Sequence, residues 1–266
     1  LGKEPINYKE FIGHGVFIFT DDGLSVVDDA LAEEIFKSLK FENGAVFQHC
    51  EKSCHTSPGD IAPPNDGGIL KPIPVSEETE ILERDLNLVE KYGTRYHAQH
   101  LSTEESVRLI KEAKMNKLPV TAEVTPHHLL INNTNIETSN GMYKMYPPIR
   151  TSRDQLALIE GLKEGTIDVI STDHAPHTIE SKQRAFKDAA RGVVGLESAF
   201  PMLYSSEIFS LDELERYLDK NPRKILSELG YELKKSNSFK WEFCDKKFYT
   251  NSNPKNSLFE GRKTLI

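Results

Sequence analysis

The residues best suited to chemistry in this sequence are histidines and an aspartate that recur just after short apolar segments. The chain has nine histidines. The residues that follow such segments are His49, His100, His127, His128 and, after the last segment, Asp173 with His177. Neutral imidazoles and carboxylates are ligands that hold Zn²⁺ while leaving a position open for water. The recurrence therefore indicates a metal site more strongly than any single histidine does.

Such a site would supply a nucleophile at neutral pH. Bound zinc lowers the pKa of water to about 7, so hydroxide is available there. Two metal ions, bridged by a carboxylate and by that hydroxide, would polarise a carbonyl and supply the hydroxide that attacks it. A further carboxylate must then move the proton, and Asp173 is the candidate general base.

A structural zinc knot is an alternative use of part of this set. His49, Cys50, Cys54 and His55 offer four ligands within seven residues. They form two adjacent pairs, whereas structural sites usually space paired ligands by two to four residues. We therefore expect both cysteines to be small buried or loop residues instead.

Signatures of other enzyme classes are missing from the sequence. It has no Gly-x-Ser-x-Gly elbow, no P-loop and no Gly-x-Gly-x-x-Gly run, and the Gly-Val-Val-Gly of residues 192–195 is too short to be one. Paired charges elsewhere are interpreted as solvated side chains: Glu33 with Glu34, Glu77 with Glu78, Lys234 with Lys235, and Lys246 with Lys247.

Short strands alternate with amphipathic helices along the chain. The expected strands are residues 16–19, 45–47, 95–99, 119–124 and 168–171. The expected helices are 28–40, 76–92, 102–114 (opened by a capping box at 102–105), 152–162, 195–204, 211–218 and one opened by Asn221-Pro222. A Pro/Gly-rich loop covers 52–75, a length typical of functional or mobile loops. The alternation predicts an α/β protein with a parallel sheet.

The position of the polar residues favours one parallel architecture over another. A doubly wound sheet would gather its site at one switch point. Here polar residues follow strand after strand, which is typical of a (β/α)₈ TIM-type barrel with its site at the carboxyl rim. A full barrel needs eight units, so about three N-terminal units are missing. We expect residues 1–230 to be the C-terminal part of the barrel and residues 231–266 to be a strap packed on it.

Composition excludes several other classes of protein. The chain has 266 residues, of which 38% are hydrophobic and 28% charged, as in ordinary globular proteins. Its formal charge of −8 disfavours a nucleic-acid surface, and no apolar run approaches the roughly 18 residues of a membrane span. Three cysteines are too few for a disulfide scaffold, so the cytoplasm is the expected compartment.

Several segments together resemble the longer, class I bacterial dihydroorotases of the amidohydrolase superfamily. The resemblance runs over nearly the whole chain, and its most specific parts are Asp-His-Ala-Pro-His at 173–177 and Thr-Pro-His-His at 125–128. The other matching segments are 20–23, 49–51, 100–103, 122–124, 147–150, 167–172, 192–198 and 251–262.

The resemblance implies an activity and a role for each candidate residue. The family closes N-carbamoyl-L-aspartate to L-dihydroorotate reversibly, in pyrimidine biosynthesis, at a site that is expected to hold two Zn²⁺ ions. By position, Asp22 would bridge the two ions, His49 and His100 would ligate one, and Asp173 would bind the other and shuttle the proton. The remaining implied roles are a contact of His177 with the substrate carboxylate, a close approach of the Gly192 backbone to the ring, and orientation of the ligands by His127 and His128.

The sequence departs from the family pattern at three places. No His-x-His precedes Asp22, so we expect the strand with these ligands, and the arginine that follows it, to lie before Leu1. The chain then corresponds to roughly the last two-thirds of a dihydroorotase. Tyr146 stands before Pro-Pro, where the family usually has a substrate-contacting asparagine, and Arg191 before Gly192 is unusual.

Three hypotheses follow for the protein as a whole. The first is an active, zinc-dependent dihydroorotase that acts on a small molecule and forms a homodimer, as the family does. The second is an inactive dihydroorotase-like subunit that supports aspartate carbamoyltransferase. The third, suggested by Tyr146, is a sister cyclic amidase, a hydantoinase or allantoinase. The Asp-Asp-Gly of residues 21–23 favours dihydroorotase over these sisters, which usually bridge their metals with a carboxylated lysine.

Overall fold

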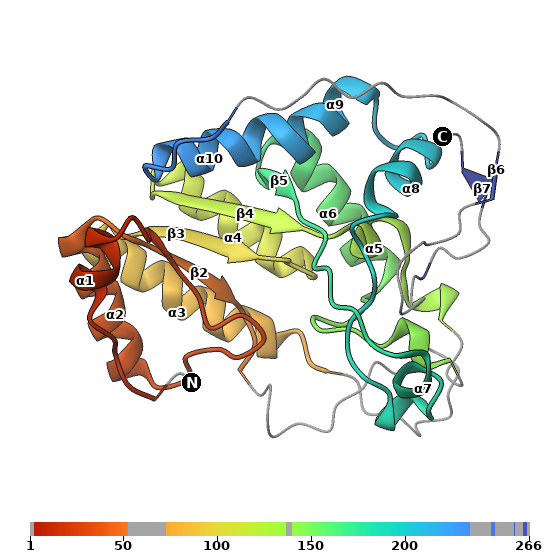
Figure 1. Cartoon of the computed structure of the whole chain (residues 1–266), viewed down its shortest axis with the longest axis horizontal. Helices are drawn as coiled ribbons and strands as arrows, with labels where there is room; N and C mark the ends of the chain where they lie inside the picture. Colours follow the sequence, from red (N-terminus) through yellow and green to blue (C-terminus); the bar gives the residue numbers. More distant parts are fainter. Residues whose placement is uncertain are drawn as a thin grey trace.

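A parallel sheet of five strands forms the centre of the molecule (Figure 1). The computed structural model describes residues 3–52, 73–136, 140–234, 246–247, 258 and 263–264. The strands are β1 (Ile18–Phe19), β2 (Ala45–His49), β3 (Arg95–Gln99), β4 (Val120–Val124) and β5 (Val169–Ile170). They lie side by side in chain order, and every neighbouring pair is parallel. This order confirms the α/β class and fits a run of consecutive β/α units from a barrel.

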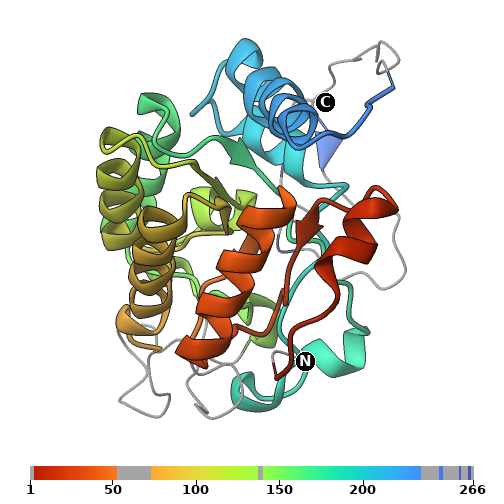
Figure 2. The same ribbon diagram turned by 90° about the vertical axis from the view of Figure 1, so that its left-hand side faces the viewer.

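Four long helices cover one face of this sheet. They are α2 (Asp29–Glu42), α3 (Ser76–Tyr92), α4 (Glu104–Met115) and α6 (Ser152–Glu164). Figure 2 shows α2, α3 and α4 side by side, and α4 packs in turn against α6. Helix α3 has the expected bounds because an apolar stripe of Ile81, Leu82, Leu86 and Val89 runs along it until Gly93 turns the chain with φ 70°.

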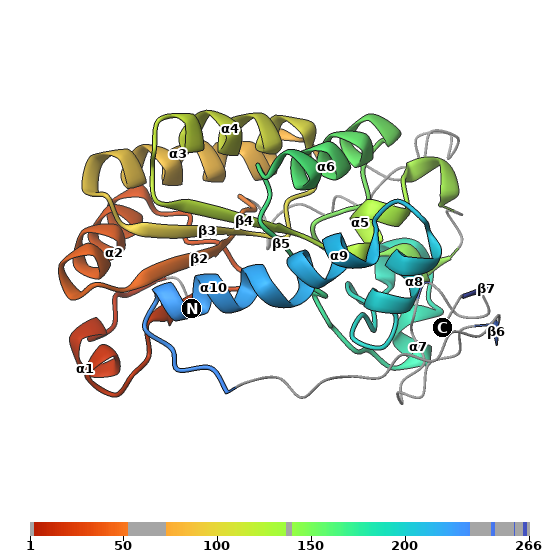
Figure 3. The same cartoon turned by 90° about the horizontal axis from the view of Figure 1, so that it is seen from above.

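The remaining elements lie at the ends and edges of the sheet. They are α1 (Tyr8–Gly13), α5 (Pro126–Leu130), α7 (Ile179–Lys182), α8 (Ala199–Ser205), α9 (Leu211–Glu215), α10 (Asn221–Glu228) and an antiparallel pair, β6 (Lys246–Lys247) with β7 (Lys263–Thr264). A π-helical stretch, Arg216–Lys220, joins α9 to α10 and packs on β5. In Figure 3, α9 and α10 lie across the sheet from α3 and α4, while α5, α7 and α8 lie beyond its carboxyl end.

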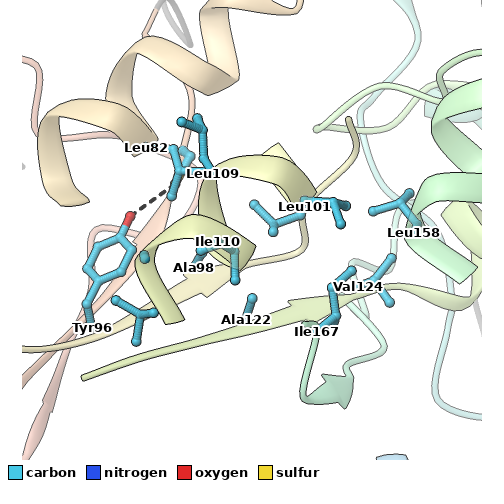
Figure 4. Close-up of a cluster of buried hydrophobic side chains, with 14 of the residues drawn as sticks. Leu82, Tyr96, Ala98, Leu101, Leu109, Ile110, Ala122, Val124, Leu158 and Ile167 are labelled. Carbon is cyan, nitrogen blue, oxygen red and sulfur yellow. Dashed lines mark hydrogen bonds between the residues drawn. The ribbon is translucent and has the colours of Figure 1, made fainter. Parts of the chain in front are cut away.

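Apolar side chains fill the space between the sheet and its four covering helices. Figure 4 shows this core, which includes Leu82, Tyr96, Ala98, Leu101, Leu109, Ile110, Ala122, Val124, Leu158 and Ile167. Alternation along β4 sends Val120, Ala122 and Val124 into the core and leaves Thr121 and Glu123 on the opposite, inner face. Each large apolar side chain buried here contributes about 1.5–3 kcal/mol, so the core fixes where the strand ends lie.

Two expectations about the start of α4 and the face of α3 were wrong. The predicted capping box does not form, because Thr103, rather than Ser102, caps α4 by accepting from the Ser106 amide. Ser102 instead donates its amide and hydroxyl to Glu78. Glu78 is therefore buried on the inner stripe of α3, with 1% of its surface exposed, and is not the solvated carboxylate we expected.

Element boundaries differ at other points for local reasons. The strand expected at 16–19 is only β1, and the helix expected from 195 starts at Ala199. At Gly195 a Cβ would lie 2.5 Å from the Thr172 carbonyl oxygen, so this segment is a close chain crossing instead of a helix. Helices α1, α5 and α7 were not expected. Most of the loop 52–75 and of the tail from 231 lies outside the described residues, so the strap remains a prediction.

None of the helices in the described parts of the chain is both long enough and apolar enough to cross a bilayer.

Candidate metal and substrate site

Three metal-ligand side chains meet where the first three strands end. His49 is the last residue of β2, His100 follows β3, and Asp22 lies three residues after β1. His49 Nδ1 lies 3.1 Å from His100 Nε2, which lies 3.1 Å from Asp22 Oδ1. Parallel strands bring their carboxyl ends to one edge, so residues far apart in sequence form one group of donor atoms within 4.8 Å of one another.

The backbone around this group is held in place by polar contacts. The Asp22 amide donates to the Thr20 hydroxyl, which donates to Gln99 at the end of β3. His100 has φ 31°, and its amide donates to the Glu123 carboxylate of β4. A non-glycine residue with positive φ is uncommon and is tolerated where surrounding structure determines it, often at functional sites.

The charges of the site favour a bound cation. Burial, with His100 beside it, lowers the pKa of His49 to about 3. Burial also disfavours a charged His100, yet the hydrogen bond to Asp22 and the charges of Asp173 and Glu123 raise the pKa of that ring to about 9. Several carboxylates thus hold a proton on a buried imidazole, and a metal ion would supply the same positive charge.

The ring nitrogens in the donor group are available to a metal ion. His49 Nδ1 and His100 Nε2 point into the group and contact only its other donor atoms, while His49 Nε2 and His100 Nδ1 point away from it and are buried without a hydrogen-bond partner. Imidazole and carboxylate donors suit Zn²⁺ and its neighbours among the divalent metals. The residues present therefore fit a metal ion held by Asp22, His49 and His100.

Asp173 lies in the same cavity but outside the donor group. The cavity has a volume of about 250 Å³, and its described lining consists of Asp22, Gly23, His49, His100, Tyr146, Asp173, Ala175, Arg191 and Gly192. Burial raises the pKa of Asp173, with Asp22 and Glu123 adding to the effect. Its φ of 43° makes it the second strained non-glycine residue at this rim. Asp173 therefore faces the cavity as a carboxylate biased toward accepting a proton.

His127 and His128 lie behind the donor group, on α5. His128 bridges the Thr125 hydroxyl, 2.7 Å from its Nδ1, and the carbonyl of Pro148, 3.1 Å from its Nε2. His127 packs against it, and neither ring is among the three metal donors. The turn that His128 holds is the one that presents Tyr146, so its contacts support the cavity wall instead of a ligand.

The expected substrate contacts occupy the other side of the cavity. Gly192 has φ 111°, and a Cβ on it would lie 2.5 Å from the Cβ of Ala175 and 3.4 Å from His177 Nε2. His177 therefore lies against Gly192, although it is not part of the cavity lining described above. Tyr146 stacks on His49 with the ring centroids 5.3 Å apart. Gly192 and Tyr146 thus face the metal donors from opposite segments.

Two residues that the sequence analysis did not single out also build the site. Glu123 binds the His100 amide and, 3.1 Å away, His97 Nε2. The sequence feature that could have revealed Glu123 is a carboxylate on the inner face of a predicted strand. Lys182 is fully buried, and its Nζ donates to the carbonyls of Lys144 and Ala190, beside the two cavity walls. No periodic pattern marks that lysine.

The alternative zinc knot receives no support from the residues that are described. Cys50 is buried and unpaired, as expected, with its sulfur 3.2 Å from the Tyr96 hydroxyl. Neighbouring residues of an extended segment face opposite sides, so Cys50 faces the core while His49 faces the cavity. Cys54 and His55 lie outside the described residues.

Comparison with known proteins identifies relatives of the chain. No family model matches the chain. A dihydroorotase from Anoxybacillus flavithermus is 41% identical over 242 residues, covering 88% of this chain and 56% of that protein. The chain is homologous to the bacterial dihydroorotases. A Fusobacterium nucleatum dihydroorotase is 40% identical over 272 residues, covering 99% of the chain and 63% of the relative. The dihydroorotase homologue thus spans about three-fifths of the length of these relatives.

Solved structures show which fold this homologue shares. An L-hydantoinase (dihydropyrimidinase) from Arthrobacter aurescens superposes with a TM-score of 0.76 over 97% of the chain and 63% of that protein, at 22% identity. A dihydroorotase from Saccharomyces cerevisiae, solved with 5-fluoroorotic acid, gives 0.60 over 75% of the chain and 54% of its own, at 21% identity. The dihydroorotase homologue therefore shares the fold of these enzymes over part of their length, which confirms in part the predicted barrel.

Proposed function

We propose that the protein carrying this chain is a dihydroorotase that interconverts N-carbamoyl-L-aspartate and L-dihydroorotate. The observation that carries the proposal is the convergence of Asp22, His49 and His100 at one rim of a barrel-type sheet, in a chain 41% identical to a protein named dihydroorotase. A small ring with an amide carbonyl suits a cavity of about 250 Å³ beside those donors.

The metal in this proposal is Zn²⁺, with two ions per site. Asp22, His49 and His100 would hold one ion, with Asp22 bridging to a second that Asp173 helps to bind. Bound zinc would polarise the ring carbonyl and provide the charge for attack. The rest of the work falls to the chain's own side chains.

Asp173 would carry the proton in this reaction. Its carboxylate faces the cavity, and its raised pKa means that it accepts a proton more readily than an ordinary aspartate. In hydrolysis it would take a proton from the attacking water and return it to the amide nitrogen as the ring opens, and in cyclisation the transfer would run backwards. In the same cavity, His177, Gly192 and Tyr146 would orient the ring, while His127 and His128 support the wall.

A substrate panel on the full-length protein tests the proposal. Turnover of L-dihydroorotate that far exceeds turnover of hydantoin and allantoin, is lost on chelation and returns with Zn²⁺ would support it. Preference for hydantoin or allantoin would favour the sister amidase. Absence of turnover together with absence of metal, on protein with a verified N-terminus, would favour the inactive subunit that supports aspartate carbamoyltransferase.

The proposal includes a setting for the enzyme. A homodimer in the cytoplasm is the arrangement that the dihydroorotase resemblance implies. The free, buried thiol of Cys50 is consistent with a reducing compartment. Light scattering of the purified protein would measure the oligomeric state.

A further inference from the structure

Arg191 lies in the wall of the cavity beside the metal donors. Its guanidinium carbon is 4.4 Å from the centroid of the Tyr146 ring, and that ring stacks on His49 at 5.3 Å with an interplanar angle of 29°. All three residues line the same cavity. The arginine is therefore held by a cation–π contact at the outer end of a short stack that begins at a metal ligand.

Arg191 forms no ion pair with a carboxylate in the part of the chain that the structure describes. Its contact is with the ring of Tyr146. A guanidinium carries five N–H donors in a plane, and stacking on a ring leaves their in-plane directions open. The guanidinium lines the same cavity as His49 and His100. Arg191 can therefore bind an anionic group of a molecule in the cavity.

Hydrogen bonds to the Lys144 carbonyl link the segment that carries Arg191 to the segment that carries Tyr146. Lys182 Nζ donates to the carbonyls of Lys144, at 2.7 Å, and Ala190, at 2.8 Å. The Gly192 amide donates to the same Lys144 carbonyl at 3.0 Å. Ala190 and Gly192, on either side of Arg191, are thus both linked to Lys144, which lies two residues before Tyr146. A group fixed in advance loses little freedom on binding, so this arrangement favours recognition.

We propose that Arg191, held on Tyr146, binds the ring carboxylate of the substrate in addition to the contact that the resemblance implies for His177, and selects cyclic amides that carry one. The inference rests on the proposed dihydroorotase function, since dihydroorotate carries a carboxylate that dihydrouracil and hydantoin lack. A planar guanidinium binds a carboxylate through two parallel hydrogen bonds. Arg191 then acts on selectivity, and the proton transfer stays with Asp173.

Two measurements on the full-length Arg191→Gln variant test the inference. For L-dihydroorotate, KM should rise about 10- to 100-fold, the loss expected for a charge-assisted pair, while kcat changes little. Calorimetry with orotate and uracil, which share a ring and differ in the carboxylate, should show the preference for orotate lost. Arg191→Lys should retain part of it, because it keeps the charge without the planar fork.

Controls separate this role from a structural one. Arg184→Gln removes an equal charge from an exposed position on the same segment and should leave KM and orotate binding unchanged. Tyr146→Leu should weaken orotate binding, and adding it to Arg191→Gln should cost less than the sum of the two. Equal loss of orotate and uracil binding, or an unchanged KM, would overturn the inference. If wild type turns over hydantoin and not dihydroorotate, the proposed function fails, while the orotate–uracil comparison still tests Arg191.

Discussion

Two buried polar clusters lie near the ends of β2 and β3, and they differ in how their hydrogen bonds are satisfied. In the first, the Glu78 carboxylate accepts from the amide and hydroxyl of Ser102 and from the hydroxyls of Thr103 and Ser106. In the second, His49 and His100 each leave one ring nitrogen buried and unpaired. Both oxygens of the Glu78 carboxylate thus have partners, whereas each of the two imidazole rings has one nitrogen without a partner.

That difference separates a structural cluster from a functional one. Burying a polar group without a partner costs free energy, so natural proteins satisfy such groups unless another requirement intervenes. The Glu78 cluster fastens α3 to the start of α4. The histidine cluster, with positive φ at His100 and at neighbouring Asp173, keeps its donors ready for a ligand. Substitutions in the two clusters should therefore affect different measurements.

The largest expected effect is on turnover, from Asp173→Asn. The amide cannot carry the proton, so we expect kcat for dihydroorotate to fall about 10²- to 10⁴-fold, with little change in melting temperature. Steady-state kinetics and circular dichroism would measure both. Asp188→Asn, an exposed change on the following segment, serves as the control. Near-normal turnover by the Asp173 variant would contradict its role as the base.

The next largest effect is on stability, from Glu78→Ala. Removing the shared acceptor leaves buried donors unpaired, so we expect the free energy of unfolding to fall by about 3 kcal/mol. The metal content and kcat of the folded fraction should stay unchanged. Chemical denaturation would measure the loss. Glu80 lies on the same helix as Glu78 and forms an exposed ion pair with Lys52. Glu80→Ala should therefore cost less than about 1 kcal/mol. Equal losses would mean that the cluster contributes nothing special.

The contrast also explains how far sequence could predict this molecule. Period and turn signals gave α3 its bounds and placed all five strands, because local patterns determine such elements. The polar residues that follow strands placed His49 and His100 at one rim, once the sheet was predicted to be parallel, and the family resemblance added Asp22. The burial of Glu78 was missed, because its partners come from another helix start 24 to 28 residues away.

Residues that act through the tertiary fold were the hardest to find. Lys182 looks like a surface lysine in sequence, and only the crossing of two loops buries it. The role of Arg191 was open for the same reason, since its stack on Tyr146 joins segments 45 residues apart. Family resemblance supplied the roles of Asp22 and Asp173, and no periodicity could have done so.

A third test acts on the shape of the cavity, through Gly192→Ala. A methyl group there would lie 2.5 Å from the Cβ of Ala175, at φ 111°, so we expect a loss of roughly 1–3 kcal/mol in unfolding free energy together with a raised KM. Gly165→Ala provides the matched control, because Gly165 has φ 80° but open space around its Cβ position. It should show backbone strain alone, with KM unchanged. A raised KM in both variants would contradict a local effect on the cavity.

The smallest expected change, taken over a single pH unit, is the pH dependence that Lys182 gives to stability. Burial, with Lys144 nearby, lowers the pKa of Lys182 to about 7 from its usual 10.5. Between these values the unfolded chain binds the proton and the folded chain does not, so unfolding free energy should rise with pH across this window, by up to about 1.4 kcal/mol per unit. Below pH 7 both states are protonated, and the contribution is constant. Chemical denaturation of wild type and Lys182→Met at several pH values isolates the contribution of Lys182. The difference in unfolding free energy, wild type minus variant, should rise from pH 7 to 10. For Lys187→Met, a change at an exposed position, the difference in unfolding free energy from wild type should not vary with pH. If the difference for Lys182→Met does not vary with pH either, the Lys182 ammonium keeps an ordinary pKa in the fold.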